Sequence, residues 1–315
     1  MPIDVAADLK PPDGKVATLL ANLDIFYKLL TQPAEENPRT ELLELFFNQS
    51  EFDDLSFLHF IEGLIESLFW REFDYSKNPY RTLCLDFAAE VDRLSTLGEG
   101  EPDYHSRRHF KDVCLALSAL LIQKPILSSN VITSEAWYLQ GNAPWILLLS
   151  AIGHDYGHDG SVNQFQFEME KKSIELAYSF FKTKNLKISF IDQLINQIEP
   201  IILATDPSYY STLIRRVVEN PSQLTQAEVL SILLVESDLM ASVMPNKGVE
   251  LGNRLGAEWE KRSIQLADIV KTKRGRLGFL ERLTYLSPQS ASLGVPSILN
   301  SCIQSIKLNL SQQNE

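Results

Sequence analysis

With 315 residues, of which 44% are hydrophobic and 22% charged, the chain has the composition of an ordinary globular protein that can bury a sizeable core. Its net charge of -12 argues against nucleic acid or an anionic membrane as the main partner, because both bind clustered Lys and Arg. The three cysteines are far apart and form no CxxC pair. The sequence also shows no secretory signal pattern and no apolar run long enough to span a bilayer. Together these features predict a soluble cytoplasmic protein with reduced thiols.

The first elements are predicted from proline, glycine and apolar spacing. Residues 1–15 contain Lys10-Pro-Pro-Asp-Gly14 and are expected to form a flexible lead-in. From Val16 onward apolar residues recur at steps of three and four, which is typical of helices that bury one face. Helices are therefore expected in the following ranges, with a break over 95–102: 42–47, 57–69, 81–94, 106–121 and from Asn142 to 153.

The second half of the chain continues the helical pattern. Helices are expected near 164–183, 189–204, 208–219, 225–243, 248–270 and 275–286. Alternation with a period of two residues is essentially absent, so the predicted fold class is all-α. We predict one compact multi-helix domain over 16–287, followed by a C-terminal helix and tail over 288–315.

One apolar run ends in three groups that can bind metal. Residues 143–153 are expected to be buried, and they lead directly into His154, Asp155 and His158. Unpaired polar groups are costly in a protein interior, so these side chains need a partner. Adjacent His and Asp can offer a nitrogen and a hard oxygen to one centre, and an aspartate can bridge two cations.

A second histidine pair and one acid fit the same interpretation. His105 and His109 lie four residues apart, and the apolar residues after His109 continue its helix face inward. Asp238 lies in another apolar run and needs a cation or a hydrogen-bonded partner there. Taken singly, these groups would also suit a core histidine or an acid that reaches solvent. Four of the five histidines fall in the two stretches around His105 and His154, which indicates a metal-dependent hydrolase.

At these residues the chain resembles a known family. Tyr104-His-Ser-Arg-Arg-His-Phe-Lys-Asp-Val113 resembles the YHNxxHAxDV segment of class I 3',5'-cyclic nucleotide phosphodiesterases. The segment from His154 to Phe165 is similar to their HDxxHPGxxNQF segment, Ala204-Thr-Asp206 matches ATD, and Glu236-Ser-Asp238-Leu matches ADL. The resemblance implies the all-helical catalytic domain of that family, within the wider HD hydrolase group.

The resemblance also implies a binuclear metal site. The residues at the matching positions for the first, tightly bound ion are His109, His154, Asp155 and Asp238. Zn²⁺ is expected there, given the two imidazoles, and Mg²⁺ or Mn²⁺ in a more hydrated second site bridged by Asp155. A hydroxide between the two metal ions is the implied nucleophile. The resemblance places His158, Thr205 and an acid, Glu170 with Glu168 as reserve, around the water ligands.

Further roles follow from the same resemblance. His105 matches the position that protonates the O3' leaving group, so it is the expected general acid. Tyr104 and Asn163 are expected to line the substrate pocket or support it. The implied partner is a small cyclic nucleotide, which would be hydrolysed to the 5'-monophosphate, with no nucleic acid and no membrane. A homodimer is left open.

The chain departs from the family where the base is bound. Members usually carry a glutamine that hydrogen-bonds the purine and then a phenylalanine that clamps it; here Arg276 takes the first position and Phe279 the second. A guanidinium only donates hydrogen bonds, so it suits the O6/N7 edge of guanine and favours cGMP over cAMP. The alternatives are an exposed basic run for Arg276 and a core position for Phe279.

Two other functions compete with a phosphodiesterase. Another HD phosphohydrolase, acting on a nucleoside phosphate or an alarmone, would use the same metal ligands. A non-catalytic nucleotide sensor would keep the pocket without turnover. The segment around His105 and the Asn163-Gln-Phe165 match argue against another HD phosphohydrolase, whereas Arg276 argues slightly for it. The presence of every expected metal ligand and of His105 argues against a sensor.

Overall fold

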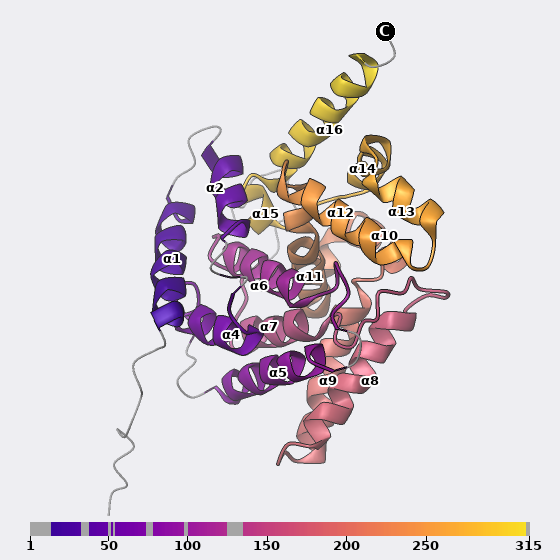
Figure 1. Cartoon of the computed structure of the whole chain (residues 1–315). Coiled ribbons are helices and arrows are strands. Elements are labelled where there is room, and N and C mark those ends of the chain that lie inside the picture. The colour runs from indigo at the N-terminus through magenta and orange to yellow at the C-terminus, as the bar shows by residue number, and fades with distance from the viewer. Residues whose placement is uncertain are drawn as a thin grey trace, which may run out of the picture.

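The computed structural model describes residues 14–32, 38–49, 52, 54–73, 78–97, 100–124 and 135–312. Within these ranges the elements are α-helices and short 3-10 helices, and there is no β-strand. The predicted all-α fold is therefore confirmed (Figure 1). Most of the predicted lead-in, residues 1–13, lies outside the described residues, and its last two residues begin the first helix.

The helices of the first half begin and end close to the predicted positions. Their bounds are α1 Gly14–Leu30, α2 Pro38–Phe47, α4 Phe57–Glu66, α5 Pro79–Ser95, α6 Arg107–Leu121 and α7 Ala143–Gly153. The helix predicted over 57–69 ends earlier, because Ser67 caps it in an extended conformation. A short 3-10 helix, η2, spans Glu135–Trp137.

The second half differs from the prediction most clearly between 248 and 270. Its helices are α8 Glu168–Lys182, α9 Ile188–Leu203, α10 Pro207–Glu219, α11 Gln226–Val243, α12 Lys247–Glu260, α13 Ile264–Lys271, α14 Lys273–Leu280, α15 Pro288–Ser292 and α16 Val295–Gln312, with a 3-10 helix, η3, over Pro221–Gln223. The single helix expected over 248–270 is wrong: it is split into α12 and α13. Ser263 causes the split, since its side chain accepts a hydrogen bond from Leu266 N and starts a new helix.

Three helices form the centre of the molecule. Every residue of α7 is buried, as are most residues of α6 and α11, and each of these helices packs against the other two. Figure 1 shows them enclosed by α1, α4 and α5 on one side and by α9, α12 and α15 on others. The surrounding helices and these three bury a continuous apolar cluster that extends from Val16 to Cys302. Polar groups on α6, α7 and α11 are therefore held in place by the core.

A buried ion pair ties the amino-terminal helices to α12. The ammonium group of Lys247 is completely buried, and its Nζ lies 3.1 Å from Asp112 Oδ2 of α6 and 3.2 Å from the Phe47 carbonyl oxygen at the end of α2. Glu44 of α2 accepts a hydrogen bond of 2.5 Å from Asn246 N just before α12. A charge removed from water needs such partners, so α2, α6 and α12 hold one another in position.

The carboxyl-terminal segment contains two helices rather than the single predicted one. The buried carboxylate of Glu236 on α11 accepts hydrogen bonds from Leu286 N (2.5 Å) and Ser287 N (2.9 Å), immediately before α15. Helix α16 then extends outward from the body of the molecule (Figure 1). Across the described residues, no helix is both long and apolar enough to cross a membrane.

Candidate active site

The three central helices bring four predicted ligands together. His109 lies in the first turn of α6, His154 and Asp155 follow the last residue of α7, and Asp238 lies in the second half of α11. Nε2 of His109 is 3.1 Å from Asp238 Oδ1 and 3.5 Å from Asp155 Oδ2. Nε2 of His154 is 3.1 Å from Asp155 Oδ2. Residues separated by up to 129 positions in the sequence, the distance from 109 to 238, thus face one point.

The orientation of His154 leaves one ring nitrogen available to a ligand. Its Nδ1 lies 2.9 Å from the carbonyl oxygen of Ala151, which can only accept, so Nδ1 carries the proton in the neutral ring. Nε2 then has a free lone pair and points at Nε2 of His109, 3.3 Å away. Two imidazole nitrogens at this distance, with no polar atom between them, would repel each other unless a cation or a proton lies between them.

The local charge favours a cation at this point. Burial alone would lower the pKa of His109, but the carboxylates of Asp155 and Asp238 outweigh burial and raise that pKa to about 10. Burial likewise opposes ionisation of Asp155, yet the histidines His154 and His105 lower its pKa well below the usual aspartate range. The carboxylate of Asp155 thus stays charged and attracts a positive charge.

The donor set fits a divalent metal ion. One nitrogen or oxygen each of His109, His154 and Asp238 lie within 4.8 Å of one another, and Asp155 adds a fourth oxygen on the same side. His109 is 2% exposed and His154 1%, whereas both carboxylates are 17% exposed. The nitrogen ligands therefore come from the buried side, and the carboxylates border the side open to solvent.

His105 stands beside this cluster and is held by a residue that the sequence analysis missed. Its Nδ1 lies 2.6 Å from Oε1 of the buried Glu258 on α12, while its Nε2 lies 4.0 Å from Asp155 Oδ2. Oε2 of Glu258 accepts hydrogen bonds from the backbone N–H groups of Tyr104 (2.8 Å) and His105 (3.0 Å). One carboxylate thus fixes both the backbone and the ring of His105. Glu258 lies in Glu258-Trp-Glu260, and no local pattern there distinguishes it from a solvated helix glutamate.

His158 lies against His105. The two imidazole rings stack with centroids 3.7 Å apart, and Nδ1 of His158 accepts a hydrogen bond of 3.0 Å from Gly160 N. Burial, together with the charge of His105, lowers the pKa of His158 to about 4, so this ring is neutral at neutral pH. The ring of Tyr104 packs on the other side of the cluster, 4.7 Å from the His109 ring.

The remaining predicted polar residues form a second group at the start of α8. The side-chain amide of Asn163 donates to Glu170 Oε2 (3.0 Å) and to Asp206 Oδ2 (3.4 Å), and its oxygen accepts from Met169 N (2.9 Å). Burial raises the pKa of Glu170, despite the hydrogen bonds it accepts. The reserve candidate Glu168 instead accepts from Gln164 N at 2.6 Å. Glu168 therefore has a local structural role, holding the loop before α8.

Backbone geometry supports the same group. Phe167 has a φ of 66°, which is unusual for a residue with a side chain, and its N–H donates to Asp206 Oδ2 at 2.7 Å. Asp206 also accepts from Ser208 N at 2.7 Å and so begins α10. The hydroxyl of neighbouring Thr205 donates to Ile202 O, which leaves the oxygen free to accept.

The two residues predicted to bind the base lie apart from the metal ligands. Nη2 of Arg276 donates to the Met244 carbonyl oxygen at the end of α11 (2.8 Å), and Nη1 is buried without a hydrogen-bond partner. The side chain of Phe279 is 39% exposed, so it is not a core residue and a ligand can reach it. Within the described part of the chain, neither side chain shares a hydrogen bond or ion pair with the histidine and aspartate cluster.

One protein-family model matches the part of the chain that contains most of these residues. Residues 104–251 match the family model described as 3'5'-cyclic nucleotide phosphodiesterase, so the match includes the four ligands, His105 and the group around Asn163. Arg276, Phe279 and Glu258 lie beyond it. No sequence among the curated proteins matches this chain.

Solved structures share the fold. The structure of LmjPDEB1 in complex with IBMX superimposes with a TM-score of 0.62 at 15% identity, covering 91% of this chain and 98% of that one. The phosphodiesterase domain of the RhoPDE fusion protein from the choanoflagellate Salpingoeca rosetta has a TM-score of 0.50 at 19% identity, covering 94% and 96%. At these identities the two structures establish the all-helical architecture and nothing finer.

Proposed function

We propose a specific division of labour among the residues of this chain. It starts from the match of residues 104–251 to the 3',5'-cyclic nucleotide phosphodiesterase family, which makes the chain a phosphoric diester hydrolase. His109, His154, Asp155 and Asp238 hold metal, His105 is the general acid, and the product is a nucleoside 5'-monophosphate. The observation that carries this proposal is the convergence of those four side chains on one point beside His105.

The metal site suits two divalent cations of different character. Two imidazoles and two carboxylates favour Zn²⁺ in the first position. Asp155 has a second carboxylate oxygen for Mg²⁺ or Mn²⁺, whose remaining ligands would be waters held by His158, Thr205 and Glu170. When bound, the two ions neutralise charge on the phosphate and make a water more acidic.

The protein's own groups complete the reaction. A water loses one proton to solvent as its oxygen forms a bond to phosphorus, and the bond from phosphorus to O3' breaks. O3' takes a proton from His105, which regains one from solvent. The alkoxide would otherwise be a poor leaving group. Glu258 accepts from Nδ1 of His105, which keeps that nitrogen protonated and leaves Nε2 to face the reacting side. Tyr104 and Asn163 support the walls of the site.

Recognition of the base is assigned to Phe279 and Arg276. Phe279 offers an exposed ring on which a purine can stack. Arg276 lies on the same helix three residues earlier, and its guanidinium can only donate hydrogen bonds, which suits the acceptors on guanine and supports a preference for cGMP over cAMP. The domain boundaries proposed from the sequence, 16–287 for the catalytic unit, are kept, with α15 and α16 packed against it.

The function is tested by identifying products. Purified protein is stripped of metal, reloaded with Zn²⁺ and with Mg²⁺ or Mn²⁺, and incubated with cyclic and linear nucleotides. We expect 5'-monophosphates from cyclic substrates only, and activity that disappears on chelation and returns on reloading. Binding of cyclic nucleotide by metal-loaded protein without turnover would indicate a sensor, and hydrolysis of linear nucleotides alone would indicate another HD phosphohydrolase.

The cGMP preference has its own test. The ratio of kcat/KM for cGMP to that for cAMP is compared in the wild type and in Arg276→Gln. We expect the ratio to fall by about tenfold, as for loss of one good base contact. Arg274→Gln is the matched control, because Arg274 is exposed in the same helix. An unchanged ratio in Arg276→Gln removes Arg276 from base recognition.

A further inference from the structure

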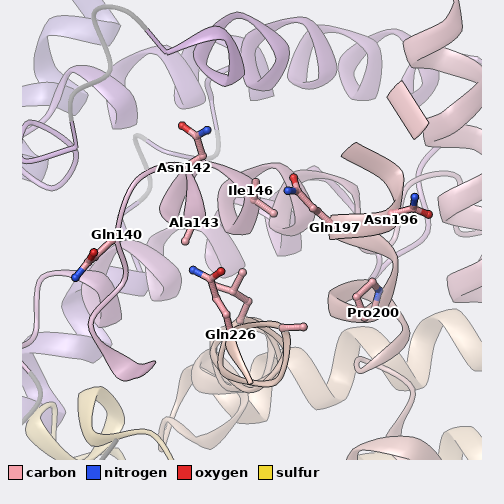
Figure 2. A pocket seen from close by; sticks show the side chains of 10 residues that line it. Gln140, Asn142, Ala143, Ile146, Asn196, Gln197, Pro200 and Gln226 are labelled. Atoms are coloured by element: carbon pink, nitrogen blue, oxygen red, sulfur yellow. The ribbon is translucent and has the colours of Figure 1, made fainter. Parts of the chain in front are cut away.

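A hollow of about 300 Å³ lies away from the metal ligands, between α7, α9 and α11 (Figure 2). It is located at the amino-terminal ends of α7 and α11, whereas His154 and Asp238 belong to their carboxyl-terminal parts. From Gln226 to Asp238 there are twelve residues of continuous helix, which span about 18 Å. The hollow is therefore separate from the proposed active site.

The lining of the hollow has an unusual composition. Five of its residues carry side-chain amides, the others are apolar, and none is charged, although 22% of the chain is charged. The amides are Gln140, Asn142, Asn196, Gln197 and Gln226. A site without charge does not compensate a charged ligand for its lost hydration, so it favours an uncharged one.

Two amides are directed at the middle of the hollow. In Figure 2 the side chains of Gln226 from α11 and Gln197 from α9 extend toward the space beside Ile146 and Ala143. Ile146 and Ala143 are buried and form an apolar floor. An apolar surface flanked by groups that both donate and accept hydrogen bonds suits a flat ring with a polar edge.

One buried acceptor without a partner and a proline in α9 strengthen this assignment. Oε1 of Gln197 is buried and has no hydrogen-bond partner, which is uncommon for a buried polar atom. Pro200 lies inside α9 and has no N–H, so it cannot donate to the carbonyl oxygen of Asn196 one turn earlier. Asn196 and Gln197 both line the hollow, and a ligand with N–H or O–H donors would give Oε1 a partner if the Gln197 amide turned toward it.

We propose that this hollow binds an uncharged heterocycle of the nucleobase type, as a free base or nucleoside, separately from the metal cluster. Side-chain amides pair with the edges of such rings through one donor and one acceptor. The volume is at the lower end of that of small-molecule sites, about 300–1,000 Å³, which suits one ring system with a small substituent.

The test measures equilibrium binding of adenosine, guanosine, cytidine and uridine to the full chain by calorimetry. At least one nucleoside is expected to bind the wild type, and Gln226→Ala and Gln197→Ala are each expected to weaken it about tenfold, the loss of one well-formed hydrogen bond. Gln193→Ala is the matched control on α9, because Gln193 is exposed and does not line the hollow.

Phe279→Ala separates this site from the catalytic one. We expect it to leave nucleoside binding unchanged, since Phe279 does not line the hollow. Binding that is lost in Phe279→Ala and kept in the two glutamine variants would place the nucleoside in the catalytic site and overturn the proposal. Absence of binding for all four nucleosides would overturn it as well. Neither result bears on hydrolysis of cyclic nucleotides, which is measured independently.

Discussion

The metal-facing part and the base-facing part of the proposed active site are built on different foundations. The metal ligands project from α6, α7 and α11, where long runs of residues are buried on all sides. Arg276 and Phe279 belong to α14, in which only Leu280 is buried. The neighbouring helix α13 likewise buries only Ala267. The residues proposed to bind metal are thus held by the core, and the residues proposed to select the substrate lie on short peripheral helices.

The largest effect is expected at the metal-facing part. Asp238→Ala should lower kcat/KM by on the order of 10³-fold or more, because the site loses several kcal/mol of charge stabilisation with its metal. Metal content, measured on the purified variant, should fall in parallel. Asp268→Ala, on the exposed side of α13, is the control and should retain both. Full activity in Asp238→Ala would show that the chemistry does not depend on this cluster.

A smaller loss is expected between the two parts, at Glu258. Glu258→Gln should lower kcat by about 10- to 100-fold, as loss of a partner that orients a functional imidazole does. Metal content should stay at the wild-type level, because Glu258 acts on His105 and not on the four ligands. The control is Glu260→Gln, because Glu260 is exposed at the end of the same helix, two residues further on, and pairs with Lys271. Loss of metal in Glu258→Gln would contradict a role confined to His105.

The base-facing part should respond in affinity rather than rate. Phe279→Ala should raise KM by about tenfold, since stacking of a base on an aromatic ring contributes about 1–3 kcal/mol. The value of kcat should change little, because α14 does not support the metal ligands. Ile264→Ala, exposed on α13, should leave both constants unchanged. If KM is unaffected in Phe279→Ala, the base does not stack there.

The smallest effect concerns stability at the edge of the metal-facing part. Asp206→Ala removes the cap of α10 and the partner of Phe167 N, and should lower the free energy of unfolding by about 1–2 kcal/mol. Burial opposes the charged form of Asp206, but hydrogen bonds from Ser208 and Phe167 outweigh it and lower its pKa below the usual 3.8.

That lowered pKa fixes the sign of the pH dependence. The stabilisation by Asp206 is fully present at neutral pH and is lost as the pH falls through 3.8 and below. The difference between wild type and Asp206→Ala in chemical denaturation should therefore shrink at acid pH. Asp206→Asn keeps the cap but cannot ionise, so it should retain most of the stability and lose the pH-dependent part.

The sequence was most informative where polar residues interrupt apolar runs. His109, His154 and Asp238 stand out because each lies in a helix face or run that must be buried, and the structure places all three together. Glu258 could not be found in this way, because α12 mixes polar and apolar residues and its partner lies 153 positions away. Long-range pairing of that kind depends on tertiary packing, which local patterns do not encode.

Helix boundaries show the same limit. The apolar spacing over 248–270 continues through the break between α12 and α13, so periodicity alone predicted one helix. The signal was present in Ser263, a residue type that commonly begins helices, but it is weak beside a continuous apolar pattern. The contact of Arg276 with the Met244 carbonyl oxygen was likewise beyond reach, because it depends on how α14 crosses the end of α11.

The buried ammonium of Lys247 sets a limit on how far the protein can be shortened. Residues 104–251 carry the family match, yet one acceptor of this ammonium is the carbonyl oxygen of Phe47, and Glu44 anchors the same turn. A fragment that began after α4 would leave Lys247 with Asp112 as its main compensating partner and α12 without its anchor. Since α12 also carries Glu258, such a fragment would lose the support of the proposed proton donor, His105, while retaining every proposed metal ligand.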